Sequence, residues 1–263
     1  MSQIPAPPAY VPGHNLLEGK AVLITAAAGS GIGYATARRC AEEGARVVIS
    51  DSHERRLGEA AAQLAADTGV APLAAVVCNV TNEDDIQRLY SEAITATGGL
   101  DVIVNNAGLG GTGNVVDLTD DAWAKVLDVT LTGTFRSMRT GLAHLYERGG
   151  GVVVNNASVL GWRAQEGQAH YAAAKAGVMA LTRCAAIEAA AHNVRVNAVS
   201  PSLAMHANLA KVTSDELLAE LVKREAFGRP AEVWEIANVI VFLASDYSSY
   251  MAGETISVSS QHP

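Results

Sequence analysis

The sequence predicts an α/β protein with a single Rossmann-like, doubly wound domain, in which a seven-stranded parallel sheet is flanked by helices on both faces. Short Val/Ile-rich runs without polar alternation recur between helical patterns, as expected for parallel strands buried on both faces. A glycine-rich turn follows the first run and opens the first helix. The length of 263 residues is sufficient for one large domain with a sizeable core.

The strands and helices are expected to alternate along the chain. Strands are predicted at 21–25, 46–50, 73–78, 101–105, 152–156, 195–199 and 254–258. The first helix is predicted to run from the glycine turn to about 43, and the third from after the third strand to about 97. The other helices are predicted at 54–67, 120–148, 169–191, 214–224 and 231–245. Residues 16–263 should form the single domain. Residues 1–15 should form an extended arm, since Met1–Pro12 contains four prolines and no signal-peptide pattern.

Composition and charge exclude several classes of protein. The formal net charge is −8 and no run of Lys or Arg occurs, so no nucleic-acid partner is expected. No stretch approaches 18 uninterrupted apolar residues, so no membrane span is expected. Cys40, Cys78 and Cys184 should be buried free thiols, consistent with a reducing cytoplasm. No Cys/His spacing indicates a metal site.

The turn from Thr25 to Gly33 has the context of a dinucleotide-binding loop. Its glycines let the backbone approach a pyrophosphate, and the helix that follows offers unpaired N–H groups and a positive dipole end. A purely structural turn is the alternative, and the strand–turn–helix context favours binding. The predicted cofactor contacts here are Thr25, Ala27, Gly29, Ser30, Gly31, Ile32 and Gly33.

Asp51 ends the second predicted strand, 18 residues after Gly33. A carboxylate there can accept hydrogen bonds from the adenosine ribose and would repel a 2′-phosphate. Ser30 adds no positive charge, so NAD is favoured over NADP. Arg55 and Arg56 follow closely and could reach a phosphate, although a solvated helix face is preferred for them.

The stretch Asn105–Gly108 follows the fourth strand. Asn side chains can tie strands together at the carboxyl edge of a sheet, and Ala107-Gly108 permits close approach of a cofactor. An ordinary turn is the alternative. Asn106, Ala107 and Gly108 are therefore predicted cofactor contacts. The loop 109–113, at the edge where such sheets bind ligands, places Leu109 on the substrate side.

Tyr171 and Lys175 are four residues apart and so share one face of the predicted helix. A nearby ammonium favours the phenolate and should lower the tyrosine's pKa toward the working range. Ser158, thirteen residues earlier, could hold a substrate oxygen. Alone, such a pair is more often an ordinary surface pair; the motifs before and after it reverse that expectation.

Together these residues resemble the short-chain dehydrogenase/reductase family over about residues 16–260. The matching motifs are the turn 25–33, Asn105–Gly108, Ser158, Tyr171 with Lys175, and Asn197-Ala198-Val199-Ser200-Pro201. The resemblance implies that the tyrosine is the general acid/base, that the lysine lowers its pKa and binds the nicotinamide ribose, and that the serine orients substrate. It also implies cofactor contacts from Pro201 and Leu203, a substrate lid at about 203–228, and a homotetramer, with a homodimer as the alternative.

The chain departs from the family pattern at four places. Thr130 replaces an asparagine that usually holds a relay water, and we expect Thr130 or its water to complete the proton path to solvent. Asn79-Val80 replaces Asp-Val, with the Asn79 amide accepting from adenine. Ala26 occupies the second position of a glycine turn that carries one extra residue, and Ser202 replaces a glycine.

The substrate side is expected to include residues near the catalytic serine and tyrosine. Trp162 could line an apolar pocket, and Arg163 could meet a carboxylate or the phosphates of a thioester's carrier, with an exposed turn as the alternative. The predicted substrate contacts are Leu109, Leu160, Trp162, Arg163, Gln168 and His206, the last more often structural than catalytic in such a position.

The stretches 156–163 and 257–263 resemble a narrower actinobacterial group associated with breakdown of the steroid C and D rings. This resemblance implies a hydroxylated indane-propionate substrate, or its coenzyme A thioester, and an NAD-dependent exchange between secondary alcohol and ketone. An NADPH-dependent 3-oxoacyl thioester reductase is the alternative enzyme. A non-catalytic dinucleotide sensor is the alternative outside enzymes, although a sensor would not require Ser158, Tyr171 and Lys175 together.

Overall fold

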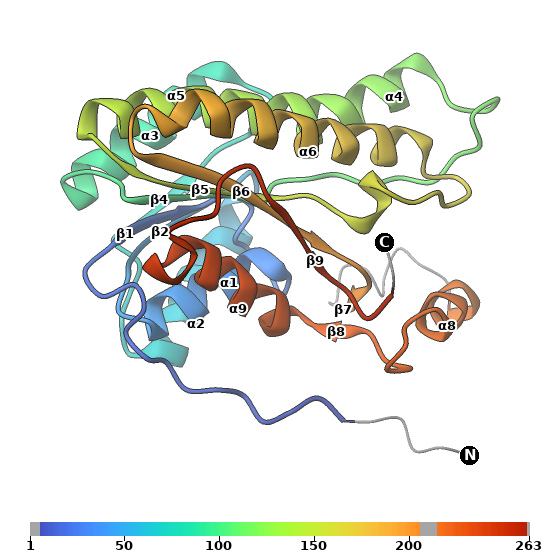
Figure 1. Cartoon of the computed structure of the whole chain (residues 1–263), viewed down its shortest axis with the longest axis horizontal. Helices are drawn as coiled ribbons and strands as arrows, with labels where there is room; N and C mark the ends of the chain where they lie inside the picture. Colours follow the sequence, from blue (N-terminus) through green and yellow to red (C-terminus); the bar gives the residue numbers. More distant parts are fainter. Residues whose placement is uncertain (1–5, 206–214, 262–263) are drawn as a thin grey trace.

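A computed structural model describes residues 6–205 and 215–261, and it contains the predicted seven-stranded parallel sheet (Figure 1). The strands are β1 (Ala21–Ile24), β2 (Arg46–Asp51), β3 (Ala74–Val77), β4 (Val102–Asn105), β5 (Gly151–Asn156), β6 (Val194–Pro201) and β9 (Thr255–Val258). Their spatial order is β3-β2-β1-β4-β5-β6-β9, and every neighbouring pair is parallel. The order reverses between β1 and β4, where ligands bind in doubly wound sheets.

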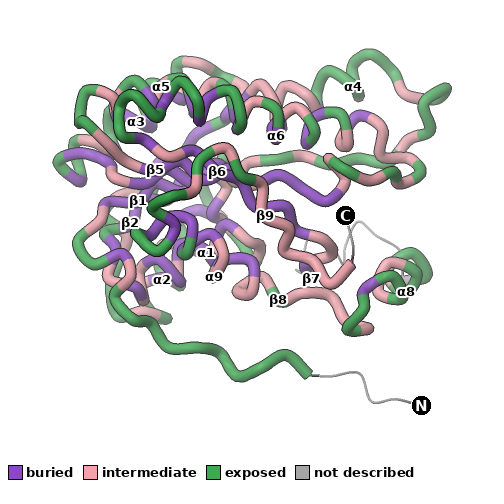
Figure 2. The backbone as a smooth tube through the Cα atoms, viewed as in Figure 1, coloured by how far each residue is buried: buried purple, intermediate pink, exposed green. Residues whose placement is uncertain are grey.

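Helices cover both faces of this sheet (Figure 1). One layer contains α1 (Ile32–Glu42), α2 (Glu54–Thr68) and α9 (Val233–Ala244), and the other contains α3 (Glu83–Thr97), α5 (Gly133–Arg148) and α6 (Ala169–Ala190). Along β1, Val22 and Ile24 pack into one apolar cluster and Ala21 and Leu23 into the other, because successive strand residues face opposite sides. Figure 2 shows the resulting buried strands. No helix in the described ranges is both long and apolar enough to traverse a bilayer.

The structure corrects three expectations. The predicted helix 120–148 is divided into α4 (Asp120–Leu127), a π-helical turn at Asp128–Thr132, and α5. Ahead of α9 the chain forms the two-residue strand β8 (Ala231–Glu232), which pairs with β7 (Ala204–Met205), so the predicted helix at 231 starts two residues later. Cys184 is exposed rather than buried, whereas Cys40 and Cys78 are buried.

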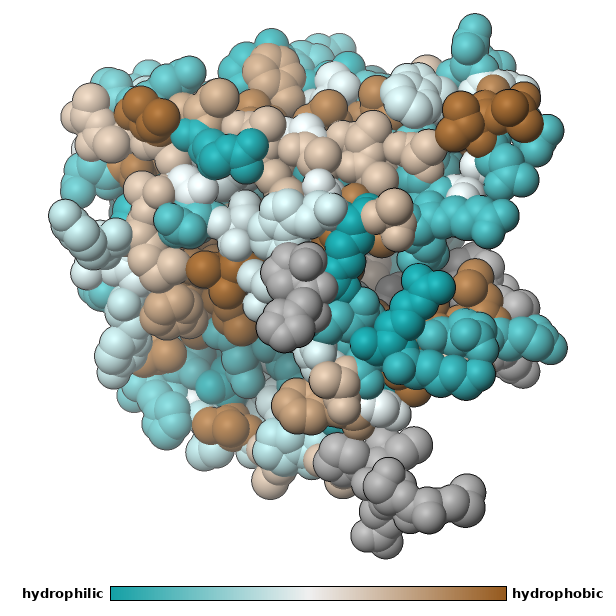
Figure 3. Space-filling view, turned by 45° about the vertical axis from the view of Figure 1, so that its right-hand side comes forward, coloured by the Kyte–Doolittle hydropathy of each residue, from teal (hydrophilic) through white to brown (hydrophobic). Residues whose placement is uncertain are grey.

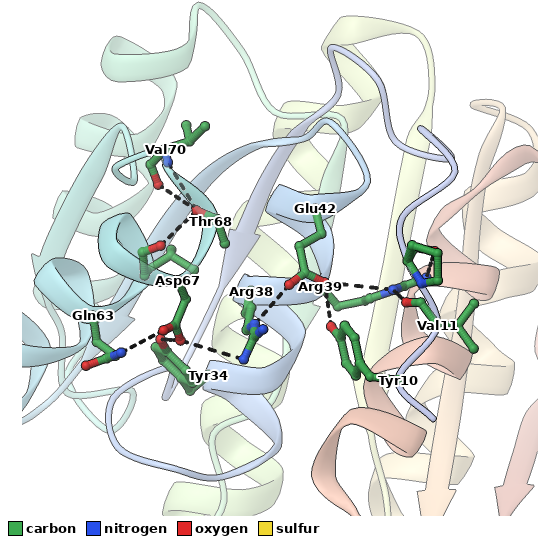
Figure 4. A network of polar contacts seen from close by, with 12 residues as sticks. Tyr10, Val11, Tyr34, Arg38, Arg39, Glu42, Gln63, Asp67, Thr68 and Val70 are labelled. Atoms are coloured by element: carbon green, nitrogen blue, oxygen red, sulfur yellow. Dashed lines mark hydrogen bonds and ion pairs between the residues drawn. The ribbon is translucent and has the colours of Figure 1, made fainter. Parts of the chain in front are cut away.

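The arm is attached to α1 through paired polar groups (Figure 4). Tyr10 donates a hydrogen bond to Glu42 at 2.5 Å, and its ring meets the edge of Trp234 in α9 with centroids 5.4 Å apart. Arg39 pairs with the fully buried Glu43 at 2.6 Å. The other oxygen of Glu43 accepts the backbone N–H of His14 at 2.7 Å. These contacts anchor the arm and give a buried carboxylate the partners it requires.

Candidate active site

The turn between β1 and α1 has the shape of an anion cradle. Ala26 and Gly29 adopt positive φ angles of 52° and 88°, so the extra residue is accommodated by left-handed backbone. A β-carbon at Gly33 would lie 2.2 Å from the carbonyl oxygen of Ala26, so only glycine fits there. Gly31 caps α1 without a side-chain hydrogen bond, which leaves the first-turn N–H groups available to a pyrophosphate.

Asp51 lies beside this turn, at the carboxyl end of β2. Its carboxylate accepts the N–H of Ala28 at 3.3 Å and that of His53 at 3.0 Å. The guanidinium of Arg56 approaches it at 3.9 Å. The residues of the turn and Asp51 thus fit the pyrophosphate and ribose of a dinucleotide, and Arg56 lies beside the carboxylate.

Thr25 and two asparagines connect the ends of β1, β4 and β5. The Thr25 hydroxyl accepts the N–H groups of Asn106 at 3.0 Å and Ala107 at 3.1 Å. The Asn106 amide donates to the carbonyl of Ala26 at 3.0 Å and accepts from Asn156 at 2.9 Å. The expectation that asparagines tie neighbouring strands therefore agrees with this geometry, and the ties hold the glycine turn in place.

A second, fully internal set of polar side chains supports the first. Asn105 donates to Asn155 at 2.8 Å across β4 and β5, and Ser137 of α5 donates to Asn105 at 2.7 Å. Asn155 donates in turn to Thr182 of α6 at 2.9 Å, and Tyr90 of α3 bonds Ser137 at 2.9 Å. The tie between Asn105 and Asn155 agrees with the expectation from the sequence, whereas the bonds to Ser137, Thr182 and Tyr90 were missed. The signal in the sequence was a pair of asparagines at the end of each of the two strands. The register of β4 and β5 is what sets Asn105 opposite Asn155.

Lys175 and Tyr171 occupy the centre of the site, on the first turns of α6. Lys175 is only 2% exposed and donates to the backbone carbonyl of Asn156 at 2.5 Å. Burial lowers its pKa to about 8. Its Nζ lies 5.6 Å from the centroid of the Tyr171 ring. The role of the Asn156 carbonyl was missed, because a backbone acceptor has no sequence signature.

The pKa of Tyr171 differs from the expectation. Burial raises it, and only a hydrogen bond with Ser158 acts in the opposite direction. The Lys175 ammonium donates instead to the Asn156 carbonyl, and burial depresses its own pKa. Ser158 is buried at the end of β5, where its hydroxyl also accepts the N–H of Leu160 at 3.2 Å. The structure thus brings Ser158, Tyr171 and Lys175 together.

Thr130 is fully buried in the π-helical turn and is bonded to the loop after β4. Its hydroxyl accepts the N–H of Leu109 at 2.9 Å and donates to the carbonyl of the same residue at 3.0 Å. A β-carbon placed on Gly108 would lie 3.4 Å from Lys175 Nζ and 3.9 Å from the Thr130 methyl. The methyl therefore faces the Gly108 backbone near Lys175, while the hydroxyl holds Leu109. The relay role of Thr130 stays a prediction.

Of the four further residues predicted to bind cofactor, two make hydrogen bonds within the protein and two are buried. The Asn79 amide oxygen already accepts from Thr81, which competes with the expected adenine contact. Val80 is buried against Gly133, where a β-carbon would lie 2.7 Å from it. Pro201 is buried at the end of β6, and the Leu203 carbonyl accepts the N–H of Ala231 at 2.8 Å.

Three predicted substrate residues, Leu160, Trp162 and Arg163, line one pocket of about 670 Å³. The α6 wall of this pocket consists of Ala169, Ala172, Ala173 and Ala176. At about 100° per residue these alanines lie on the side of the helix turned away from Tyr171. The pocket therefore adjoins the reacting groups without containing them.

The other predicted substrate residues lie at the entrance of α6 or outside the described ranges. Gln168 donates to the carbonyl of Gly111 at 2.7 Å and so fastens the loop after β4 to the start of α6. A β-carbon at Gly110 would lie 4.0 Å from Tyr171 Cδ2, so this loop borders the phenol. His206 lies outside the described residues. Val115 and Val116 are exposed in the segment before α4, and Figure 3 shows apolar surface over this upper right part of the molecule.

A phenol that can exchange a proton beside a dinucleotide cradle defines an oxidoreductase that interconverts hydroxyl and carbonyl groups. The chain belongs to the short-chain dehydrogenase/reductase family. A family model described as enoyl-(acyl carrier protein) reductase matches residues 26–260.

Three relatives show where the chain lies within the family. It is 61% identical to a (5R,7aS)-5-hydroxy-7a-methyl-1-oxo-2,3,5,6,7,7a-hexahydro-1H-indene-carboxyl-CoA reductase of Mycobacterium tuberculosis, over 97% of this chain and 98% of the relative. It is 40% identical to a cis-4-hydroxycyclohexanecarboxylate dehydrogenase of Sinomonas cyclohexanicum, over 90% and 94%. It is 37% identical to a 3-oxoacyl-[acyl-carrier-protein] reductase of Thermotoga maritima, over 92% and 97%.

Solved structures agree on the fold. A short chain dehydrogenase from Mycobacterium smegmatis superposes with a TM-score of 0.88 at 56% identity, over 99% of this chain and all of that one. An NAD⁺-bound xylitol dehydrogenase superposes with a TM-score of 0.86 at 31% identity, over 93% and 99%. The predicted family and fold, and the resemblance to actinobacterial enzymes of steroid breakdown, are thereby confirmed.

Proposed function

We propose that this protein is an NAD-dependent enzyme that interconverts a secondary alcohol and a ketone on an apolar alicyclic substrate bearing an acyl group, such as a steroid-derived indane acid or its coenzyme A thioester. The observation that carries the proposal is the cluster of Ser158, Tyr171 and Lys175 beside the cradle at the β1–β4 switch point. The names of the Mycobacterium and Sinomonas relatives support the alicyclic acyl substrate.

The roles of the protein groups follow from their positions. When bound, the nicotinamide cofactor supplies or accepts the hydride. Tyr171 carries the proton for the substrate oxygen, and its raised pKa keeps the phenol protonated, as reduction of a ketone requires. Ser158 acts against the rise in the pKa of Tyr171 and can orient the same substrate oxygen. Lys175, with its pKa near 8, can exchange a proton at neutral pH and is fixed by the carbonyl of Asn156.

Replacing the phenol tests the assignment. We expect Tyr171→Phe to lower turnover of cyclic secondary alcohols with NAD by at least about 1,000-fold, because the proton carrier is removed. NADH binding, followed by fluorescence, should persist. Tyr146→Phe is the matched control, since Tyr146 stacks on His192 away from the site. Substantial turnover by Tyr171→Phe would contradict the assignment.

A 3-oxoacyl thioester reductase that uses NADPH is the second candidate, supported by the Thermotoga relative. The two candidates differ in coenzyme. Asp51 supports NAD, because its carboxylate would repel a 2′-phosphate. Arg56, 3.9 Å from that carboxylate, is the group that could favour NADPH.

A coenzyme titration separates the candidates. We expect NADH to bind at least about tenfold more tightly than NADPH, and Asp51→Asn to narrow the difference by removing the repelling charge. Asp67→Asn is the control, since this carboxylate lies on α2 and bonds Tyr34. Tighter binding of NADPH by the unmodified protein would favour the 3-oxoacyl reductase.

A further inference from the structure

The segment after β9 contacts Arg163, one of the predicted substrate residues. Beyond β9, the Ser260 hydroxyl donates to Glu225 at 2.6 Å and the Gln261 amide donates to the other oxygen of Glu225 at 2.7 Å. Arg163 donates to the amide oxygen of Gln261. In Figure 1 the end of β9 lies near β7 and the segment that carries α8 (Asp215–Lys223). Three segments that are distant in sequence are therefore joined by one amide.

Glu225 depends on the tail for its hydrogen bonds. It is 4% exposed, and a buried carboxylate is costly unless donors surround it. Among the described residues, its donors are the side chains of Ser260 and Gln261 and the backbone N–H of Leu203 at 3.4 Å. Two of the three come from the tail, so removing either leaves an under-bonded buried charge.

Arg163, at the other end of this chain of contacts, has hydrogen-bond donors that no described group accepts. Its Nη1 is bonded to Gln261, whereas its Nε and Nη2 are buried and lack an acceptor among the described groups. The residue lies five positions after Ser158 and lines the 670 Å³ pocket with Leu160 and Trp162. A guanidinium with free donors in a sheltered place is suited to a carboxylate or acyl oxygen.

The orientation of the Gln261 amide matches its neighbours. Its oxygen faces the cation Arg163 and its NH₂ faces the anion Glu225. We propose that Gln261 is a positioning residue for substrate: it couples Glu225 to Arg163 and so holds the guanidinium where its free donors can bind the acyl end of the substrate. This inference rests on the proposed function, because it assumes an acyl-bearing substrate.

Kinetics with two cyclic alcohols tests the proposal. The probes are cis-4-hydroxycyclohexanecarboxylate and cyclohexanol, each with NAD. We expect Gln261→Ala to raise KM for the hydroxy acid about tenfold, because a charge-assisted contact is lost, with kcat and the KM for cyclohexanol unchanged. Gln63→Ala is the matched control, since that exposed amide bonds Asp67 on α2.

Exchanging the two partners gives a rescue. Gln261→Glu alone should raise KM for the hydroxy acid, because two carboxylates would then face each other. Glu225→Gln alone should also raise it, because the acceptor for the Gln261 amide is weakened. The double variant reverses amide and carboxylate and should restore KM. An unchanged KM in Gln261→Ala, an equal rise for both alcohols, or a failed rescue would overturn the proposal.

Hydrogen exchange gives a readout that does not need turnover. We expect the backbone amides of Leu203 and Glu225 to exchange faster in Gln261→Ala and to recover in the double variant, because the tail holds this segment. Unchanged exchange would show that the tail does not hold it. If the unmodified protein turns over neither alcohol, the proposed function fails, and the exchange result still decides whether the coupling through Gln261 exists.

Discussion

Lys175 is a lysine whose charge the fold disfavours. Its side chain is almost completely buried, its ammonium donates to the carbonyl of Asn156, and burial lowers its pKa from 10.5 to about 8. Its neighbour Tyr171 has a raised pKa, so both groups are shifted toward their neutral forms. The burial of these two groups favours proton exchange at the site and lowers the stability of the folded protein.

That cost should appear in the pH dependence of stability. Between about pH 8 and 10.5 the native protein binds fewer protons at Lys175 than the unfolded chain does, so the contribution of Lys175 to the free energy of unfolding rises with pH in this window. Compared with Lys175→Met, the wild type should gain at most about 3 kcal/mol from pH 8 to 10.5, with a constant difference below pH 8.

Urea unfolding of the cofactor-free proteins across this range measures the difference. Lys223→Met is the control, because Lys223 is exposed on α8, which lies apart from the helix α6 that carries Lys175 (Figure 1). A flat difference for Lys175→Met would show that the pKa of Lys175 is not lowered.

The α4–π–α5 segment is the element that departs most from the sequence pattern. An extra residue in the turn at Asp128–Thr132 turns Thr130 inward, where its hydroxyl bonds both backbone groups of Leu109. Helical periodicity continues through 120–148, so the pattern gave no sign of the interruption; π-turns are often found at functional sites. The element thus holds the loop that borders Tyr171.

Thr130→Val keeps the methyl group and removes the hydroxyl. We expect the free energy of unfolding to fall by about 1–3 kcal/mol, because the backbone groups of Leu109 lose their partner inside the protein. The solvent isotope effect on kcat should stay unchanged if the hydroxyl only holds the loop. A changed isotope effect at unchanged stability would instead place Thr130 in the proton relay. Thr119→Val, at the cap of α4, is the control.

At the scale of the whole molecule, the sheet collects the site from distant parts of the chain. The ends of β1, β4 and β5 meet at the switch point, and Thr25, Asn106 and Asn156 are joined there although they span much of the sequence. The layers of helices pack against the sheet through two apolar clusters, one on each face. The carboxyl edge of the sheet is therefore the place where cofactor and substrate groups can meet.

Local patterns in the sequence were sufficient for the fold class, the strands and the glycine turn, because burial periodicity is a local property of the chain. The order of motifs along the whole chain predicted the Ser158–Tyr171–Lys175 set. The tertiary structure alone decided contacts between residues far apart. It directed Lys175 to the carbonyl of Asn156, bonded the Thr130 hydroxyl to Leu109, and joined Arg163 to Glu225 through Gln261. Such pairings depend on strand register and helix packing, which no single stretch of sequence encodes.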